Sequence, residues 1–313
     1  MEATVCPLCA ADEAEPLFVG RDVLFDFPGE FPVMRCRRCG LTYNNPRVPP
    51  DEIHRFYGAD YHAHDAMSPT SRRCGTAETA VPQVDRRRRG GRAAWDRVER
   101  FGGARLLDVG CGGGSYLARM QGRGWDVLGV DPMPRAVESC RASGVPAMLG
   151  TVPGVDLGGR RFELFTLRAS LANLPAPRAT LAALREYAAP GAVLIASAFN
   201  SDGWLARRCG PLWPGWDLPR QYCHYAPHTM RRLLETTGWR VERLEFRRRP
   251  NLARRAARLM AEATGRRMWR LAASRRWLTS LMSTCCAGMQ RADEICAVAR
   301  AAAERAPVRT ANV

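Results

Sequence analysis

Three glycines alternate with other residues directly after a short apolar run, and this turn constrains the fold more than any other feature of the 313-residue sequence. The run is Arg105-Leu106-Leu107-Asp108-Val109, and the turn is Gly110-Cys111-Gly112-Gly113-Gly114. In parallel α/β sheets such a turn joins a buried strand to a helix, and its glycines let the backbone approach a ligand beyond the carboxyl end of the strand. We expect the helix over residues 115–121 and a ligand site at the turn.

The sequence around this turn alternates between apolar strands and helical segments. Strands are predicted at residues 126–130, 147–150, 162–167, 192–198, 240–246 and 294–299, and helices at residues 134–142, 178–188 and 228–236. Alternation with short connections predicts a parallel sheet wound by right-handed crossovers and covered by helices on both faces. The expected fold class is therefore α/β.

Two acids distinguish the turn from a dinucleotide site. A dinucleotide fold uses G-x-G-x-x-G to place a pyrophosphate on a helix N-terminus, whereas Ser115 occupies the position of the third glycine here. Asp108 would repel a pyrophosphate but can accept a hydrogen bond from an ammonium group. Asp131 ends the second strand, where a carboxylate can bind both hydroxyls of a ribose. The pattern favours a nucleoside with a cation and no phosphate, the shape of S-adenosylmethionine (SAM). An ordinary strand-to-helix turn, with Asp131 as a helix cap, is the alternative.

Four of the twelve cysteines form two C-x2-C pairs, which are Cys6 with Cys9 and Cys36 with Cys39. Each pair can present two thiolates to one ion, and two pairs complete the tetrahedral four-sulfur shell of structural zinc. Gly40 supports this interpretation, because the residue after such a turn often needs a positive φ. A closed shell leaves no open coordination position, so the predicted zinc is structural. Disulfides are the alternative, and the lack of a secretory signal layout at the N-terminus disfavours them.

The stretch from Leu106 to Gly114, together with Asp131, resembles the class I SAM-dependent methyltransferases, and specifically the bacterial group with an N-terminal four-cysteine zinc ribbon. Other blocks resemble the same group: Cys36–Leu41 through Asn45-Pro46, Phe56-Tyr57 and Tyr61, Trp216–Arg220, His224–Pro227, and Ala292–Arg300. The resemblance implies a Rossmann-like sheet with an antiparallel last strand. It also implies that SAM is bound by Asp108 near the methionine ammonium, Asp131 on the ribose, Met133 near the adenine, and a loop of Gly110, Gly112 and Gly114.

The resemblance further implies how the chain is divided. Residues 1–46 are expected to form the zinc ribbon, residues 47–92 a helical linker and cofactor lid, residues 93–250 the SAM-binding core, residues 251–291 a basic helical insertion, and residues 292–313 the last core strand and a tail.

Three departures from the group bear on turnover. The segment Leu171–Pro177 carries no acid or histidine where related enzymes have E-H-x-x-D-P. Gly150-Thr151 stands where an acid that meets the adenine amino group is expected, and Gln221 replaces the first histidine of the W-D-x-P-R-H-x-x-H block. A SAM-binding protein that has lost turnover therefore remains an alternative.

His224 is the candidate general base. It matches the second histidine of that block, and an imidazole titrates near neutrality. Methyl transfer is an in-line displacement, in which the enzyme aligns the nucleophile and removes a proton from a hydroxyl or an acidic carbon. A structural histidine, hydrogen-bonded beside Tyr222 and Tyr225, is the alternative. His62 and His64 are assigned to the lid.

The formal charge of +16 and the pI of about 10.0 indicate an anionic partner. However, all 47 basic residues are Arg, a composition typical of a GC-rich genome, so an unspecialised basic surface is an equal alternative. In residues 251–291 Arg alternates with Leu, Met and Trp, which is typical of a membrane-interface helix or of a plain helical cover. No run reaches the roughly 18 apolar residues of a membrane span. We expect a cytoplasmic protein, with peripheral contact to the inner face of the membrane as a further hypothesis.

The resemblance suggests O- or C-methylation of a small molecule: a saccharide, a nucleotide sugar or a natural-product scaffold. Methylation of RNA is an alternative, in which the ribbon and the Arg-rich surface would hold the nucleic acid. Against it, acids outnumber Arg21 and Arg35 between the two cysteine pairs. Neither the substrate nor the oligomeric state follows from the sequence.

Overall fold

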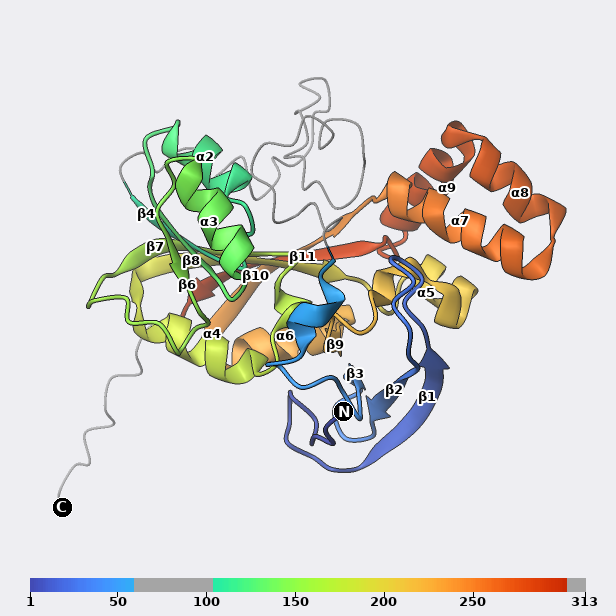
Figure 1. The fold of residues 1–313 in the computed structure, drawn as a ribbon, viewed down its shortest axis with the longest axis horizontal. Coiled ribbons are helices and arrows are strands. Elements are labelled where there is room, and N and C mark those ends of the chain that lie inside the picture. Colours follow the sequence, from blue (N-terminus) through green and yellow to red (C-terminus); the bar gives the residue numbers. More distant parts are fainter. Residues whose placement is uncertain (59–103, 303–313) are drawn as a thin grey trace, which may run out of the picture.

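The structure is a computed structural model that describes residues 1–58 and 104–302. A seven-stranded sheet forms its centre (Figure 1). Across the sheet its strands are β10 (Trp239–Arg247), β11 (Glu294–Ala301), β8 (Ala188–Phe199), β7 (Phe162–Arg168), β4 (Arg105–Val109), β5 (Asp126–Asp131) and β6 (Ala147–Leu149). The five strands from β8 to β6 are parallel, and β11 pairs antiparallel with both β8 and β10. The predicted Rossmann-like sheet with an antiparallel last strand is confirmed.

Helices cover both faces of this sheet (Figure 1). On one face lie α2 (Ser115–Gln121) and α3 (Pro134–Ala142), and on the other lie α4 (Pro177–Glu186) and α6 (Pro227–Thr236). Two separate apolar clusters fill these layers because successive side chains of a strand point to opposite faces. Leu106 packs with the α2 and α3 layer, and its neighbour Leu107 packs with the α4 and α6 layer.

A second, four-stranded sheet joins the N-terminal segment to the core. It contains β1 (Ala14–Gly20), β2 (Phe31–Cys36), β3 (Thr42–Asn44) and β9 (Cys223–His224), in that order. The short strand β9 comes from the core, and it pairs Thr42 with His224 and Tyr43 with Cys223. The N-terminal ribbon is therefore attached to the core by backbone hydrogen bonds as well as by side chains.

A helical unit lies between β10 and β11 and extends from one end of the sheet (Figure 1). It comprises α7 (Pro250–Thr264), α8 (Arg267–Ser274) and α9 (Arg276–Gly288). Its inner side packs against α5 (Trp204–Cys209) and the following single-turn helices η5 (Gly210–Leu212) and η6 (Pro214–Trp216). Among the residues that the structure describes, no helix combines the length and the apolarity that crossing a membrane requires.

The described residues also form the short helices η1 (Ile53–Phe56) and η4 (Leu171–Asn173). The predicted lid residues Tyr61, His62 and His64 lie outside the described residues, as does most of the predicted linker.

Candidate functional site

The glycine turn lies between β4 and α2, at the carboxyl end of β4. Gly110, Gly112 and Gly114 have φ values of 76°, 54° and 79°, which side chains with a Cβ rarely adopt. A Cβ on Gly110 would lie 2.4 Å from the Cβ of Ser170, and one on Gly114 would lie 2.5 Å from the Sγ of Cys140. The turn therefore needs glycine both for its backbone conformation and for its close packing.

Asp131 holds this turn from the end of the neighbouring strand. Its Oδ2 accepts a hydrogen bond from the backbone N–H of Gly112 at 2.9 Å, and its Oδ1 accepts one from Met133 at 2.9 Å. The carboxylate thus fixes the turn, the start of α3 and the position of Met133 at once. Carboxylate oxygens are also acceptors of the kind that ribose hydroxyls need.

Asp108 lies beneath the turn and is 2% exposed. Its Oδ1 accepts a hydrogen bond from the Thr166 hydroxyl at 2.6 Å. Burial raises the pKa of Asp108 to about 6, a rise that nearby Arg168 opposes and Asp131 reinforces. The Arg168 guanidinium stacks over the Tyr116 ring at 3.9 Å. A further cation beside Asp108, such as an ammonium group, would favour its charged form.

The predicted cofactor residues therefore lie together at the carboxyl ends of β4 and β5. Three features of this site fit an adenosyl sulfonium. They are a backbone turn without side chains, the buried acid Asp108, and the acid Asp131, which holds the turn. Their binding roles stay predictions.

The four paired cysteines converge in the ribbon. Their sulfurs all lie within 4.8 Å of one another, with Cys6 to Cys39 and Cys9 to Cys36 at 3.5 Å. Four sulfurs held 2.3 Å from one zinc ion would lie about 3.8 Å apart, so the spacing fits the ion.

The two turns that present these cysteines are alike. The backbone N–H of Ala10 donates to the carbonyl of Cys6, and that of Gly40 donates to the carbonyl of Cys36, both at 2.9 Å. Ala10 and Gly40 both have positive φ values, 58° and 76°, so the expected conformation of Gly40 is confirmed. Burial raises the pKa of the Cys6 thiol to about 11. A bound cation would offset this cost of a buried thiolate.

His224 lies in β9, at the junction of ribbon and core, and is 2% exposed. Its Nε2 lies 2.9 Å from Oδ1 of Asn44, and its ring meets Trp216 edge to face at 5.0 Å. Burial lowers the pKa of His224 to about 3, so the imidazole is neutral at physiological pH. The role of general base stays a prediction, and these surroundings favour the structural alternative.

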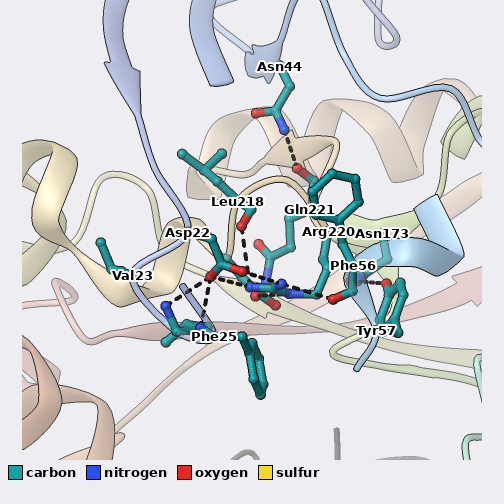
Figure 2. Close-up of polar contacts among 12 residues, drawn as sticks. Asp22, Val23, Phe25, Asn44, Phe56, Tyr57, Asn173, Leu218, Arg220 and Gln221 are labelled. Atoms are coloured by element: carbon teal, nitrogen blue, oxygen red, sulfur yellow. Dashed lines mark hydrogen bonds and ion pairs between the residues drawn. The ribbon is translucent and has the colours of Figure 1, made fainter. Parts of the chain in front are cut away.

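A buried ion cluster around Arg220 connects the same two parts of the chain (Figure 2). The guanidinium donates two hydrogen bonds of 2.7 Å to Asp22 and one of 2.7 Å to Asp217, and a further one to the carbonyl of Phe56. Asp22 and Arg220 have fully buried side chains. The W-D-x-P-R block contains Asp217 and Arg220, but no sequence signal identifies Asp22, which lies 198 residues from Arg220.

Tyr57 and Asn173 meet close to this cluster, next to the glycine turn. The Asn173 side-chain amide donates to the Tyr57 hydroxyl at 3.0 Å, as Figure 2 shows. Asn173 ends η4, the helix that begins beside Ser170, whose Cβ packs against Gly110. The segment Leu171–Pro177, which carries no acid or histidine, is therefore joined to Tyr57 by a polar contact.

Comparison with known proteins agrees with this geometry. Residues 84–244, just over half of the chain, match the family described as "Methyltransferase domain". The chain belongs to this methyltransferase family. Over 108 residues it is 35% identical to a ubiquinone biosynthesis O-methyltransferase from Cereibacter sphaeroides, a match that covers 33% of this chain and 44% of the relative. A relative with the same description from Hahella chejuensis is 32% identical over 113 residues, which are 32% of this chain and 45% of the relative. The match thus spans less than half the length of these curated methyltransferases.

Solved structures of methyltransferases show likeness as well. The SAM-bound amino pentose methyltransferase CalS10 from Micromonospora echinaspora is 34% identical, over 32% of this chain and 44% of that chain, with a TM-score of 0.29. A SAM-dependent methyltransferase from Mesorhizobium loti is 16% identical, over 67% of this chain and 98% of that chain, with a TM-score of 0.44.

Proposed function

We propose that this methyltransferase transfers the methyl group of SAM to a hydroxyl group of a small molecule, either a saccharide, a nucleotide sugar or a natural-product scaffold. The proposal rests on the glycine turn, where a backbone without side chains lies beside the carboxylates of Asp108 and Asp131. The O-methyltransferase descriptions of the curated relatives support oxygen as the accepting atom.

The residues of this chain would act mainly by binding and alignment. When bound, SAM supplies an electrophilic methyl group on its sulfonium. Asp108 would hold the ammonium group, Asp131 the ribose hydroxyls, and Met133 would lie against the adenine. In the transfer, a carbon–oxygen bond would form and the carbon–sulfur bond would break, which leaves S-adenosylhomocysteine, and the acceptor hydroxyl would lose its proton to water. Alignment of the reacting atoms can contribute several kcal/mol, on the order of 7–11 kcal/mol in well-oriented systems.

Two measurements test this function. Isothermal titration should show SAM binding that the Asp131→Ala variant loses. Incubation with [methyl-³H]SAM and the methanol-soluble metabolite pool of the source cells should label a small molecule, in which NMR locates the methyl group on oxygen. SAM binding without any labelled product would instead support the alternative of lost turnover, and a label on carbon would refute the proposed acceptor.

We also propose that the four-cysteine cluster holds one structural zinc ion that keeps the ribbon folded against the core. The spacing of the four sulfurs and the two matching turns support this. Metal analysis should find one zinc per chain, and the Cys39→Ser variant should bind less metal and melt at a lower temperature. Retention of full stability after complete metal removal would contradict this role.

The outer helices α8 and α9 favour an anionic lipid surface as a partner. Met268, Leu271, Trp277 and Leu281 are each more than half exposed, and residues 265–292 contain six Arg and no acid. Exposed apolar side chains among cations suit the interface of an anionic membrane. The protein should float with phosphatidylglycerol vesicles but not with pure phosphatidylcholine vesicles, and Trp277→Ser should weaken this binding. Equal recovery with both vesicle types would refute it.

A further inference from the structure

A buried carboxylate that the proposed mechanism does not use lies at the same sheet edge as the SAM turn. Glu294 is the first residue of β11 and pairs with Phe199, the last residue of β8. Because β11 runs antiparallel to β8, the start of β11 lies at the carboxyl edge of the parallel strands, where ligands of α/β sheets bind.

Glu294 also points to the same face of the sheet as Asp108. Cys296 lies two residues after Glu294 and Leu106 two residues before Asp108, and both pack in one apolar cluster with α2 and α3. Since side chains alternate with a period of two, Glu294 and Asp108 share the face of Cys296 and Leu106. Two strands, β7 and β8, separate them, and the register places Asp108 level with Val298, four residues from Glu294. At the usual strand spacing and rise per residue their backbones are roughly 19 Å apart.

The Glu294 side chain makes one bond where it has capacity for more. It is 2% exposed, and its Oε1 accepts from Nη2 of Arg249 at 2.6 Å. Its Oε2 and the Nε of Arg249 are both buried, and neither has a hydrogen-bond partner among the described residues. Buried polar atoms of native proteins are nearly always paired, and an Arg–carboxylate contact is frequently bidentate. The pair therefore has one buried acceptor, Oε2 of Glu294, and one buried donor, Nε of Arg249, that have no hydrogen-bond partner among the described residues.

The adjoining Asp293 anchors this pair. Its Oδ2 accepts from the backbone N–H of Arg249 at 3.3 Å and from the Ser283 hydroxyl at 3.1 Å, and it is 1% exposed. Asp293 thus connects the start of α7, the helix α9 and the start of β11 at one point. The Arg249 side chain is 22% exposed, so the pair lies next to the surface on the Arg249 side.

We propose that Glu294 and Arg249 bind a hydroxyl group of the methyl acceptor, remote from the atom that is methylated. A hydroxyl both donates and accepts, so it can satisfy the carboxylate oxygen and the guanidinium N–H together. The separation from Asp108, three strand spacings across the sheet and four residues along it, assigns the pair to the far end of an acceptor that carries several hydroxyls, which favours the saccharide class among the proposed substrates. This inference rests on the proposed methyl transfer.

The test compares two variants of the pair with a matched neighbour. Glu294→Gln keeps the shape of the side chain, and Arg249→Met keeps most of its stem. Arg248→Met is the control, because Arg248 is exposed and contacts only Thr284 among the described residues. Each variant is melted to verify folding, titrated with SAM, and assayed with [methyl-³H]SAM over a dilution series of the metabolite pool.

We expect Glu294→Gln and Arg249→Met to need at least tenfold more acceptor for half-maximal labelling, while their SAM affinity changes less than twofold. Glu294→Asp should recover part of the loss, and the control should match the unaltered protein. Unchanged acceptor dependence in both variants of the pair would overturn this inference and leave the proposed function standing. An unaltered protein that binds SAM and labels nothing would instead overturn the proposed function.

Discussion

Replacement of Arg220 by Met should destabilise the protein strongly, and the loss should depend on pH. The side chain is fully buried and joins Asp22 of the N-terminal segment to Asp217 of the core through three charge-assisted hydrogen bonds of 2.7 Å. Without the guanidinium, the carboxylates of Asp22 and Asp217 share one site and lose the cation that is hydrogen-bonded to both. Removing one member of a buried ion pair costs roughly 3–5 kcal/mol, and we expect Arg220→Met to reach this range at pH 7.

The pH dependence follows from the two carboxyl groups. In the intact protein Arg220 lowers the pKa of Asp22, so that Asp22 adds stability above its unfolded pKa and loses it as the pH falls through the folded value. Burial raises the pKa of Asp217 even beside Arg220. In Arg220→Met both folded-state pKa values should lie above the unfolded values. Protonation at lower pH then relieves the repulsion, so the destabilisation should be smaller at pH 5 than at pH 7.

Urea unfolding at both pH values, followed by circular dichroism with zinc present, measures these differences. Asp22→Asn should cost less than Arg220→Met, because Asp217 still pairs with the guanidinium. Arg21→Met is the control, since the bridge from Arg21 to Glu30 is exposed and should contribute less than about 1 kcal/mol. A loss for Arg220→Met that equals the control, or that grows as the pH falls, would refute this account of the cluster.

Three other predictions concern the turn and the histidine. Gly110→Ala should abolish SAM binding in isothermal titration, because its Cβ would clash with Ser170 and strain a φ of 76°; tight binding by this variant would contradict the proposed role of the turn. SAM affinity should fall as the pH drops through about 6, where Asp108 takes up a proton, and Asp108→Asn should remove this dependence; an affinity constant from pH 5 to 8 would exclude Asp108 as the ammonium partner. His224→Gln should lower the melting temperature but leave the shape of the pH–rate profile unchanged, because the pKa of His224 is about 3; loss of a kinetic pKa near neutrality would restore it as the base.

The local elements could largely be predicted from the sequence because their signals are local. The predicted helices at residues 115–121 and 134–142 coincide with α2 and α3, and the strand at residues 105–109 coincides with β4. One difference lies at the Pro190-Gly191 turn, which was expected to precede a strand starting at residue 192. The strand β8 starts at Ala188 instead, and its register with β7 shifts between Phe162 and Leu164. An irregularity in pairing depends on the neighbouring strand, which the local sequence does not contain.

Long-range polar contacts could not be predicted in the same way. His224 was interpreted through its place in a motif and its ordinary pKa, but its burial and its bond to Asn44 arise only when β9 joins the ribbon sheet. Glu294 showed no sequence signal beyond its strand, since its relation to Arg249 depends on the antiparallel return of β11 beside β8.

By itself, the sequence determined the α/β class, the glycine turn with its two acids, and the two C-x2-C pairs. These features depend on the spacing of residues along the chain, and that spacing follows directly from backbone conformation and ligand geometry. Only the tertiary structure decided which charges are buried and which residues they meet. Asp22 and Arg220 are 198 residues apart, and His224 joins a sheet built mostly from the first 44 residues. Burial and partnership set the protonation of such groups, and both arise from contacts between segments that are distant in the chain.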